Sequence, residues 1–297
     1  MNNKNSNIKL IECPRDAMQG WPEYIPLEKK IDYLNLLLKV GFDTLDFGSF
    51  VSPKAIPQLR DTKEVLAGLD FSNSRTKLLA IIANVRGAEE AAEYDEISFL
   101  GFPFSISEEF QRRNTNSTID ESLIRVEEMH SICIRKNKQL VVYISMGFGN
   151  PYGEIWTPDI VLNWIKQLTQ KGIQIIALAD TIGVSNPVNI TQLFSILIPE
   201  FPNVEFGAHL HSIPEMWKEK IIACENSGCL RFDSALKGIG GCPMADNELV
   251  GNLATENLVN YFGGPAALGL DNFFFNESLR MANEIFTYNF DKTSNYY

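Results

Sequence analysis

The chain has few positive charges and no run of them. Lysine and arginine total 26 against 37 aspartate and glutamate residues, so the formal net charge is −11. Proteins that bind nucleic acids present basic patches to the phosphates, and this charge balance argues against a nucleic-acid partner. A small anionic substrate needs only a few cationic side chains near its binding site, so the net negative charge does not exclude one.

Long apolar stretches are also missing. No run reaches the roughly 18 residues of a membrane-spanning helix, so we expect no membrane partner. The first residues, Met1–Asn7, are polar and lack the apolar core of a secretory signal peptide. The five cysteines are odd in number and have no paired zinc-site spacing. Together these absences favour a reducing compartment and a cytoplasmic protein.

Short strand-like runs alternate with amphipathic helical segments along the chain. The eight runs are Ile8–Cys13, Thr44–Phe47, Lys77–Ala83, Glu96–Leu100, Leu140–Ser145, Ile173–Leu178, Val204–His209 and Leu230–Ala235. Helical segments such as Leu27–Val40, Asp159–Lys171 and Pro214–Ser227 lie between them, and Thr118 with Glu121 forms a capping-box pair. Eight such units in about 250 residues are typical of an α/β fold, the (β/α)8 TIM barrel.

We therefore expect residues 1–297 to form a single TIM-barrel catalytic domain, with extra helices after Asn252 that flank the barrel. A doubly wound open sheet is the alternative fold. It would usually carry a Gly-x-Gly-x-x-Gly turn after its first strand, whereas this chain has Pro14-Arg15-Asp16 there.

The positions of the reactive side chains support the barrel. Active sites of TIM barrels lie at the carboxyl ends of the strands. The side chains best suited to catalysis all fall at or just after such an end, although they are far apart in sequence: Arg15, Asp16, Asp46, Asp180, His209, His211 and Cys242. The barrel would bring them to one rim.

Two of the three histidines form the pattern His209-Leu210-His211 at the end of a predicted strand. Successive strand side chains alternate faces, so both imidazoles point the same way. Imidazole nitrogens combined with a carboxylate and an amide oxygen suit a divalent metal, Mg²⁺ or Mn²⁺ above all, and Co²⁺ or Zn²⁺ could substitute. The alternative is that the two histidines only form structural hydrogen bonds at the rim of the barrel.

Several runs resemble the hydroxymethylglutaryl-CoA lyase family, part of a wider group of metal-dependent barrel lyases and acyl-CoA synthases. The similar runs occur in the same order between about Ile8 and Gly264: Thr44–Lys54 (TLDFGSFVSPK), Leu178–Val184 (LADTIGV), His209–His211 (HLH), Gly240–Pro243 (GGCP) and Gly251–Glu256 (GNLATE). The resemblance implies a metal held by Asp16, His209, His211 and Asn252 beside Arg15. It also implies that Cys242 is the cysteine of the family's glycine loop.

The chain departs from the family pattern at a few positions. Asp46 stands where the family usually has glutamate, Gly20-Trp21 follows Gln19 where Asn-Glu is typical, and Ser212-Ile213-Pro214 follows His211. Lys237 and Met244 flank the glycine loop where a small and an aromatic residue are usual. These changes bear on the fit of the substrate.

The expected roles follow from chemistry and from this resemblance. Arg15 would offset negative charge on a thioester oxygen, although it could instead be a structural ion-pair partner of Asp16 or Asp46. Asp16, or a water that it holds, would accept a proton, and Cys242 would donate one. Asp46 would tune the metal ligands.

Two assignments have structural alternatives. Asp180 would orient a ligand or cap the following helix, and Asn252 could be a helix cap. Lys54, Arg112 and Arg113 are candidates for holding coenzyme A.

The sequence thus predicts a carbon–carbon lyase that cleaves 3-hydroxy-3-methylglutaryl-CoA, or a close 3-hydroxyacyl-CoA, to acetyl-CoA and acetoacetate or the matching oxo acid. One alternative is a Claisen-type synthase that joins acetyl-CoA to a 2-oxo acid. Another is a metal-containing barrel that binds an acyl-CoA without turnover. The expected partners are a small acyl-CoA substrate and a second copy of the chain, in a homodimer.

Overall fold

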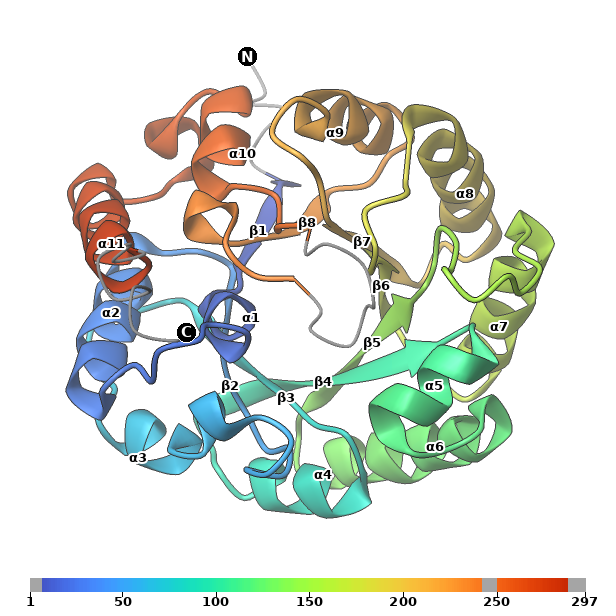
Figure 1. The fold of residues 1–297 in the computed structure, drawn as a ribbon, viewed down its shortest axis with the longest axis horizontal. Helices are drawn as coiled ribbons and strands as arrows, with labels where there is room; N and C mark the ends of the chain where they lie inside the picture. Colours follow the sequence, from blue (N-terminus) through green and yellow to red (C-terminus); the bar gives the residue numbers. More distant parts are fainter. Residues whose placement is uncertain (1–6, 242–249, 288–297) are drawn as a thin grey trace, which may run out of the picture.

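A computed structural model shows a closed barrel of parallel strands surrounded by helices, and it describes residues 7–241 and 250–287 (Figure 1). The strands are β1 (Lys9–Glu12), β2 (Thr44–Ser49), β3 (Lys77–Ile81), β4 (Ile97–Ser105), β5 (Gln139–Ser145), β6 (Ile175–Asp180), β7 (Glu205–Leu210) and β8 (Arg231–Ser234). Each strand pairs with the next, and β8 pairs with β1, where Glu12 lies opposite Ser234. The predicted TIM barrel is confirmed.

Helices connect consecutive strands, most of them on the outside of the barrel, whereas the short helix α1 lies inside this outer ring (Figure 1). They are α1 (Pro14–Gln19), α2 (Leu27–Val40), α3 (Thr62–Ala67), α4 (Val85–Ala92), α5 (Glu108–Thr115), α6 (Ile119–Arg135), α7 (Pro158–Gln170), α8 (Pro187–Glu200) and α9 (Trp217–Asn226). The capping box predicted at Thr118 and Glu121 is present and begins α6.

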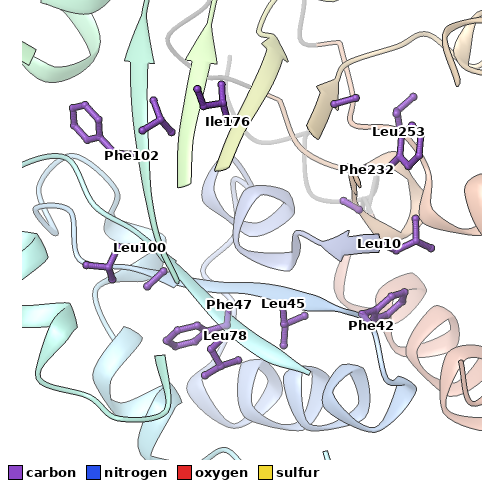
Figure 2. Close-up of a cluster of buried hydrophobic side chains, with 14 of the residues drawn as sticks. Leu10, Phe42, Leu45, Phe47, Leu78, Leu100, Phe102, Ile176, Phe232 and Leu253 are labelled. Atoms are coloured by element: carbon purple, nitrogen blue, oxygen red, sulfur yellow. The ribbon is translucent and has the colours of Figure 1, made fainter. Parts of the chain in front are cut away.

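The strands are buried on both faces, which explains their nearly continuous apolar sequences. Every residue of β6 is buried, for example. One hydrophobic layer lies between the strands and the helices; Figure 2 shows Leu10, Phe102, Ile176 and Phe232 from this layer. A second, smaller cluster fills the barrel interior. It consists of alternate residues of β3 to β6: Leu79, Ile81, Phe99, Val141, Tyr143, Ile175 and Ala177.

Some predicted element boundaries were wrong. β4 continues to Ser105, past the predicted end at Leu100 and through Pro103. Proline is tolerated there because β3 pairs with β4 only as far as Gly101, so no neighbour needs the missing N–H. β6 ends at Asp180 itself, and α9 begins at Trp217, three residues after the predicted Pro214.

Extra helices follow the barrel, as predicted. They are α10 (Thr255–Tyr261), the short 3₁₀ helix η4 (Pro265–Leu268) and α11 (Asn272–Ile285). Helix α11 packs against α2 (Figure 1). The ring of Phe286 forms T-shaped contacts with the rings of Trp21 and Tyr33. Across the described part of the chain, no helix combines the length and the apolar character that crossing a bilayer requires.

Candidate active site

A cavity of about 210 Å³ opens at the carboxyl ends of the strands. Four predicted site residues line it: Arg15, Asp16, His209 and His211. The rest of the wall is mixed, with apolar side chains beside hydroxyl and amide groups: Gln19, Val51, Ala55, Ile56, Ile81, Ala83, Pro103, Phe110, Asn114, Thr115, Tyr143, Ser145, Ala179 and Thr181. The barrel therefore brings together groups that are almost 200 residues apart.

Arg15 and Asp16 lie on α1, which begins directly after β1. Pro14 occupies its first turn, where the missing N–H is not needed by the helix. Because the backbone turns here instead of continuing as a strand, the two adjacent side chains can meet. Arg15 Nη1 donates to Asp16 Oδ1 over 3.1 Å, and it also donates to Gln19 Oε1 over 2.8 Å.

Asp46, in β2, accepts hydrogen bonds from the Nε and Nη2 edge of the Arg15 guanidinium. Arg15 Nε lies 3.2 and 3.0 Å from the two carboxylate oxygens, and Nη2 lies 2.6 Å from Oδ2. These bonds engage four of the five N–H groups of Arg15. Among the residues that the structure describes, the fifth, on Nη2, has no acceptor and is left for a ligand in the cavity.

The charge state of Asp46 reflects its burial. Burial raises the pKa of this carboxyl group to about 6, against the opposing effect of Arg15. Both carboxylate oxygens face the guanidinium, and Asp46 lies outside the group of potential metal ligands. This geometry fits an indirect role, in which Asp46 orients Arg15.

Asp16 is the hub of the site. Its Oδ1 accepts from Arg15 and from Gln19 Nε2 at 2.9 Å, and its Oδ2 accepts from Asn252 Nδ2 at 2.6 Å. Burial opposes ionisation of Asp16, but Arg15, the two imidazoles and the Asn252 amide outweigh it and lower its pKa. Asp16 is therefore a carboxylate at neutral pH.

His209 lies near the end of β7 and His211 directly follows the strand, and their ring centroids are 5.5 Å apart. His209 Nδ1 lies 3.2 Å from Asp233 Oδ2. Burial lowers the pKa of His209, but the bond to Asp233 outweighs this and raises it. Burial and the neighbouring His209 lower the pKa of His211 to about 4, so this ring is neutral.

The residues present fit a divalent metal. One ligand atom from each of Asp16, His209 and His211 lies within 4.8 Å of the others. Both ring nitrogens of His211 are buried and have no hydrogen-bond partner among the described residues. Leaving such groups unpaired is costly, and a cation between these side chains would satisfy one of the nitrogens.

Asn252 reaches the site by pairing with the end of β7. It forms an isolated antiparallel bridge with His211, and its Nδ2 donates to Asp16 and to the carbonyl of Ile239. Only Oδ1 of this amide is then free to bind a cation. Gly240 passes close to it: a Cβ there would lie 2.4 Å from Asn252 Nδ2, so a larger residue at 240 would displace the amide.

Asp180 holds a loop. It accepts backbone hydrogen bonds from Val184 and Ser185 at 2.8 and 3.0 Å, and Lys220 Nζ lies 3.0 Å from its Oδ2. Lys220 also donates to the carbonyl of His211 over 2.7 Å. Asp180 therefore reaches the histidine pair only through Lys220, as a positioning residue.

Glu12 ties together three segments around the site. Its Oε1 accepts from the backbone N–H of Leu236, in the 3₁₀ turn η3 (Leu236–Gly238), and its Oε2 accepts from the Thr255 hydroxyl at the start of α10. Burial raises the pKa of Glu12 from 4.5 to about 8. This carboxyl group joins β1, the approach to the glycine loop and the helix after Asn252.

The remaining predicted residues are not at the cavity wall. Arg112 and Arg113 are exposed on α5, where they form ion pairs with Glu108 and Glu109, and Lys54 is exposed after β2. Their neighbours in sequence, such as Asn114 and Ala55, do line the cavity. Cys242 lies outside the described residues.

Sequence reasoning missed Asp233 and Lys220 and gave Gln19 no role. Asp233 and Lys220 are 1% and 2% exposed. Charged residues inside a strand that is buried throughout, as in Arg231–Ser234, are themselves a signal, because such groups are almost never fully buried without partners. Lys220 lies on a helix and has no comparable signal.

The HMGL-like family model matches residues 7–264. Hydroxymethylglutaryl-CoA lyase of Bacillus subtilis is 33% identical over 246 residues, which cover 83% of this chain and 81% of that protein. The human cytoplasmic 3-hydroxy-3-methylglutaryl-CoA lyase is 32% identical over 268 residues, covering 89% and 70%.

Solved structures agree. An HMG-CoA lyase from Acinetobacter baumannii, in complex with coenzyme A and 3-methylmalate, superposes with a TM-score of 0.86 at 30% identity and covers 96% of this chain and 93% of that one. Hydroxymethylglutaryl-CoA lyase from Pseudomonas aeruginosa gives a TM-score of 0.86 at 29% identity, covering 95% and 94%.

Proposed function

Because this chain belongs to the HMGL-like family, we propose that it cleaves 3-hydroxy-3-methylglutaryl-CoA, or a close 3-hydroxyacyl-CoA, to acetyl-CoA and acetoacetate or the matching oxo acid. The observation that carries this proposal is the convergence of Asp16, His209 and His211 on one point beside Arg15, at the wall of the cavity. A carbon–carbon lyase needs a place to bind a hydroxyl group and a cation near the thioester oxygen.

The cleavage breaks the bond between the tertiary carbinol carbon and the α-carbon of the thioester. A divalent cation held by Asp16, His209, His211 and Asn252 would lower the pKa of the substrate hydroxyl and offset charge on its oxygen. Asp16, or a water that it holds, accepts the hydroxyl proton. The carbinol carbon becomes the ketone of the oxo acid, and the bonding electrons pass to the α-carbon as an enolate.

Arg15 faces this enolate. Its remaining N–H on Nη2 hydrogen-bonds the thioester oxygen, where the negative charge collects. Asp46 and Gln19 hold the guanidinium in place before the substrate arrives. The thiol of Cys242 then gives its proton to the α-carbon, which completes acetyl-CoA. Asp180 acts indirectly, since it anchors Lys220 under the His211 backbone.

Features of the complete enzyme belong to the same proposal. We expect Mg²⁺ or Mn²⁺ as the native metal, with Co²⁺ or Zn²⁺ as substitutes, and a cytoplasmic homodimer. Lys54, Arg112 and Arg113 are candidates for the phosphates of coenzyme A. All three are exposed around the cavity, and Arg112 and Arg113 share α5 with the lining residues Phe110, Asn114 and Thr115.

The test is a panel of 3-hydroxyacyl-CoA thioesters, assayed for release of acetyl-CoA with Mg²⁺ or Mn²⁺. We expect turnover of 3-hydroxy-3-methylglutaryl-CoA or a near relative, and loss of turnover with a chelator. Condensation of acetyl-CoA with a 2-oxo acid would instead identify a synthase. Metal binding without turnover of any thioester would identify a non-catalytic barrel.

A further inference from the structure

His209 belongs to a second group of potential ligands deeper in the barrel. Ligand atoms of Cys13, His209 and Asp233 all lie within 4.8 Å of one another. Cys13 directly follows β1, and the register of the sheet places Asp233 beside both Ile11 and His209. Cys13 and Asp233 are each 1% exposed. These three residues, called the inner triad below, share only His209 with the group formed with Asp16 and His211.

The inner triad contains an unsatisfied group. Asp233 Oδ1 is buried and has no hydrogen-bond partner among the described residues, while Oδ2 faces His209 Nδ1 at 3.2 Å. The thiol of Cys13 has only a long contact, 3.6 Å, to the carbonyl of Ile11. A buried carboxylate with a free oxygen is expensive unless something positive lies against it.

The charges around the thiol attract a cation. Burial raises the pKa of the Cys13 thiol most, the carboxylates of Asp233, Asp46 and Asp16 raise it further, and the guanidinium of Arg15 opposes them. Arg231, one layer further down the barrel, is ion-paired with Glu205 at 3.0 Å, and the charge of Asp233 helps to raise its pKa. The charged groups that act on the thiol itself are three carboxylates and one guanidinium, so a divalent cation there would meet more negative than positive charge.

We propose that the inner triad is a second metal site, selective for a borderline-soft ion such as Zn²⁺ or Co²⁺. Such ions accept thiolate, imidazole and carboxylate ligands in tetrahedral geometry, with bonds of about 2.0–2.3 Å. Two oxygen or nitrogen ligands of one tetrahedral ion lie about 3.3 Å apart on these bond lengths. The separation of 3.2 Å between Asp233 Oδ2 and His209 Nδ1 already matches this. Three protein ligands leave the fourth position for water.

The two sites exclude each other at His209. A metal at the inner triad binds Nδ1 and leaves the ring proton on Nε2, which then cannot bind a second cation beside Asp16 and His211. The Cys13 thiol loses its proton to solvent as the metal binds. A hard ion such as Mg²⁺ has no affinity for thiolate and stays with the oxygen-rich group. The ion that is present would thus determine which of the two groups binds it. This inference does not depend on the proposed lyase activity.

The test is titration of the metal-free full-length protein with Co²⁺, followed by near-ultraviolet absorption. Thiolate bound to Co²⁺ gives an intense charge-transfer band that nitrogen and oxygen ligands do not give. We expect the wild type to develop this band at one equivalent. Cys13→Ser and Cys13→Ala should lose it and should bind Zn²⁺ at least about 10-fold more weakly in chelator competition. Both variants should keep the far-ultraviolet circular dichroism and the Mn²⁺ affinity of the wild type.

Three further variants locate the thiolate. The band should persist in Cys242→Ser, which removes the thiol of the glycine loop, and in His211→Ala, which damages only the other group. Asp233→Asn should weaken it. A wild type without the band, a band that survives in both Cys13 variants, or a band lost in Cys242→Ser would each overturn the proposal.

Discussion

The guanidinium of Arg15 is fixed before any substrate binds. Asp46 accepts hydrogen bonds from Nε and Nη2, and Asp16 and Gln19 accept from Nη1, so one N–H on Nη2 is left to act. A donor that needs no reorganisation stabilises developing charge better than a mobile one. The constraint also makes the planar shape of arginine necessary, because an ammonium group cannot satisfy three carboxyl and amide partners in one plane.

Arg15→Lys should therefore fail although it keeps the charge. We expect kcat to fall by a few hundred-fold, corresponding to about 3–4 kcal/mol for one lost oxyanion donor. The matched control is Arg280→Lys, an exposed arginine of α11 paired with Glu277 and Glu284, which should leave kcat within about two-fold of the wild type. Steady-state kinetics decide the matter. A change confined to KM would make Arg15 a binding group.

Cys242→Ser tests the proton donor. A hydroxyl is a much weaker acid than a thiol, whose ordinary pKa is about 8.5, so turnover should fall by about 10²–10⁴-fold while metal affinity stays unchanged. Cys133→Ser, on α6 away from the cavity, is the control for replacing a thiol. Lyase activity close to that of the wild type in Cys242→Ser would show that the proton comes from another group.

At this scale, the sequence predicted several side chains that the barrel brings together at the cavity. His209 and His211 follow from strand alternation, and Asp16 follows from its place after β1. Asp233 and Lys220 could not be assigned, because their roles depend on what the closed barrel places beside them: a ring nitrogen in one case, and a backbone carbonyl with a buried carboxylate in the other. Sequence spacing does not encode such neighbours.

At the scale of elements, the site depends on the pairing of β8 with β1, which closes the barrel and is called the seam below. Glu12 joins β1 to η3 and α10, and α1 and Asn252 extend from the same region. The seam was only partly predictable. Hydrophobic runs identified both strands. The short helix α1 and the contacts of the buried Glu12 with η3 and α10 were not predicted, because they depend on the three-dimensional arrangement.

Glu12 should make stability depend on pH. Its pKa is 4.5 when exposed and about 8 in the fold, so the folded state binds the extra proton between these values. Stability is therefore greatest below about pH 4.5 as far as this group is concerned. The contribution of Glu12 to the free energy of unfolding declines as the pH rises from about 4.5 to about 8 and stays low above about pH 8. Glu12→Gln, which mimics the protonated acid, should remove this decline and be more stable than the wild type at about pH 9, by on the order of 1 kcal/mol or more.

Urea unfolding at about pH 5 and about pH 9 measures the difference. Glu89→Gln, on the exposed part of α4, is the control and should leave the pH dependence of the wild type intact. If Glu12→Gln shows the same decline as the wild type, the carboxyl group is ionised in the fold and its place in the seam needs another explanation.

At the scale of the whole molecule, the predicted metal ligands span most of the chain. Asp16 and Asn252 are 236 residues apart, yet an amide nitrogen of one lies 2.6 Å from a carboxylate oxygen of the other. A cation held by both would bind the folded barrel and not the unfolded chain. Saturating Mn²⁺ at about 100 times its Kd should then add about 2.7 kcal/mol to the free energy of unfolding and raise the Tm by several degrees.

The three histidines provide the control for this prediction. His209→Ala should abolish the Mn²⁺-dependent rise in Tm, whereas His130→Ala, on α6, should retain it even if its own Tm is lower. Differential scanning calorimetry with and without the metal gives both values. An equal rise in the two variants would place the cation elsewhere.

The distance in sequence between Asp16 and Asn252 also sets an order of events during synthesis. A chain growing on the ribosome already has Asp16, His209 and His211 exposed well before residue 252 emerges, but β1 cannot yet meet β8, because β8 is among the last strands made. The proposed cation site would therefore be complete only after β8 has paired with β1 and Asn252 has reached His211. A nascent or truncated chain that ends before Asn252 would lack one of the proposed metal ligands. Cation binding would therefore report that the N-terminal and C-terminal parts of the barrel have packed together.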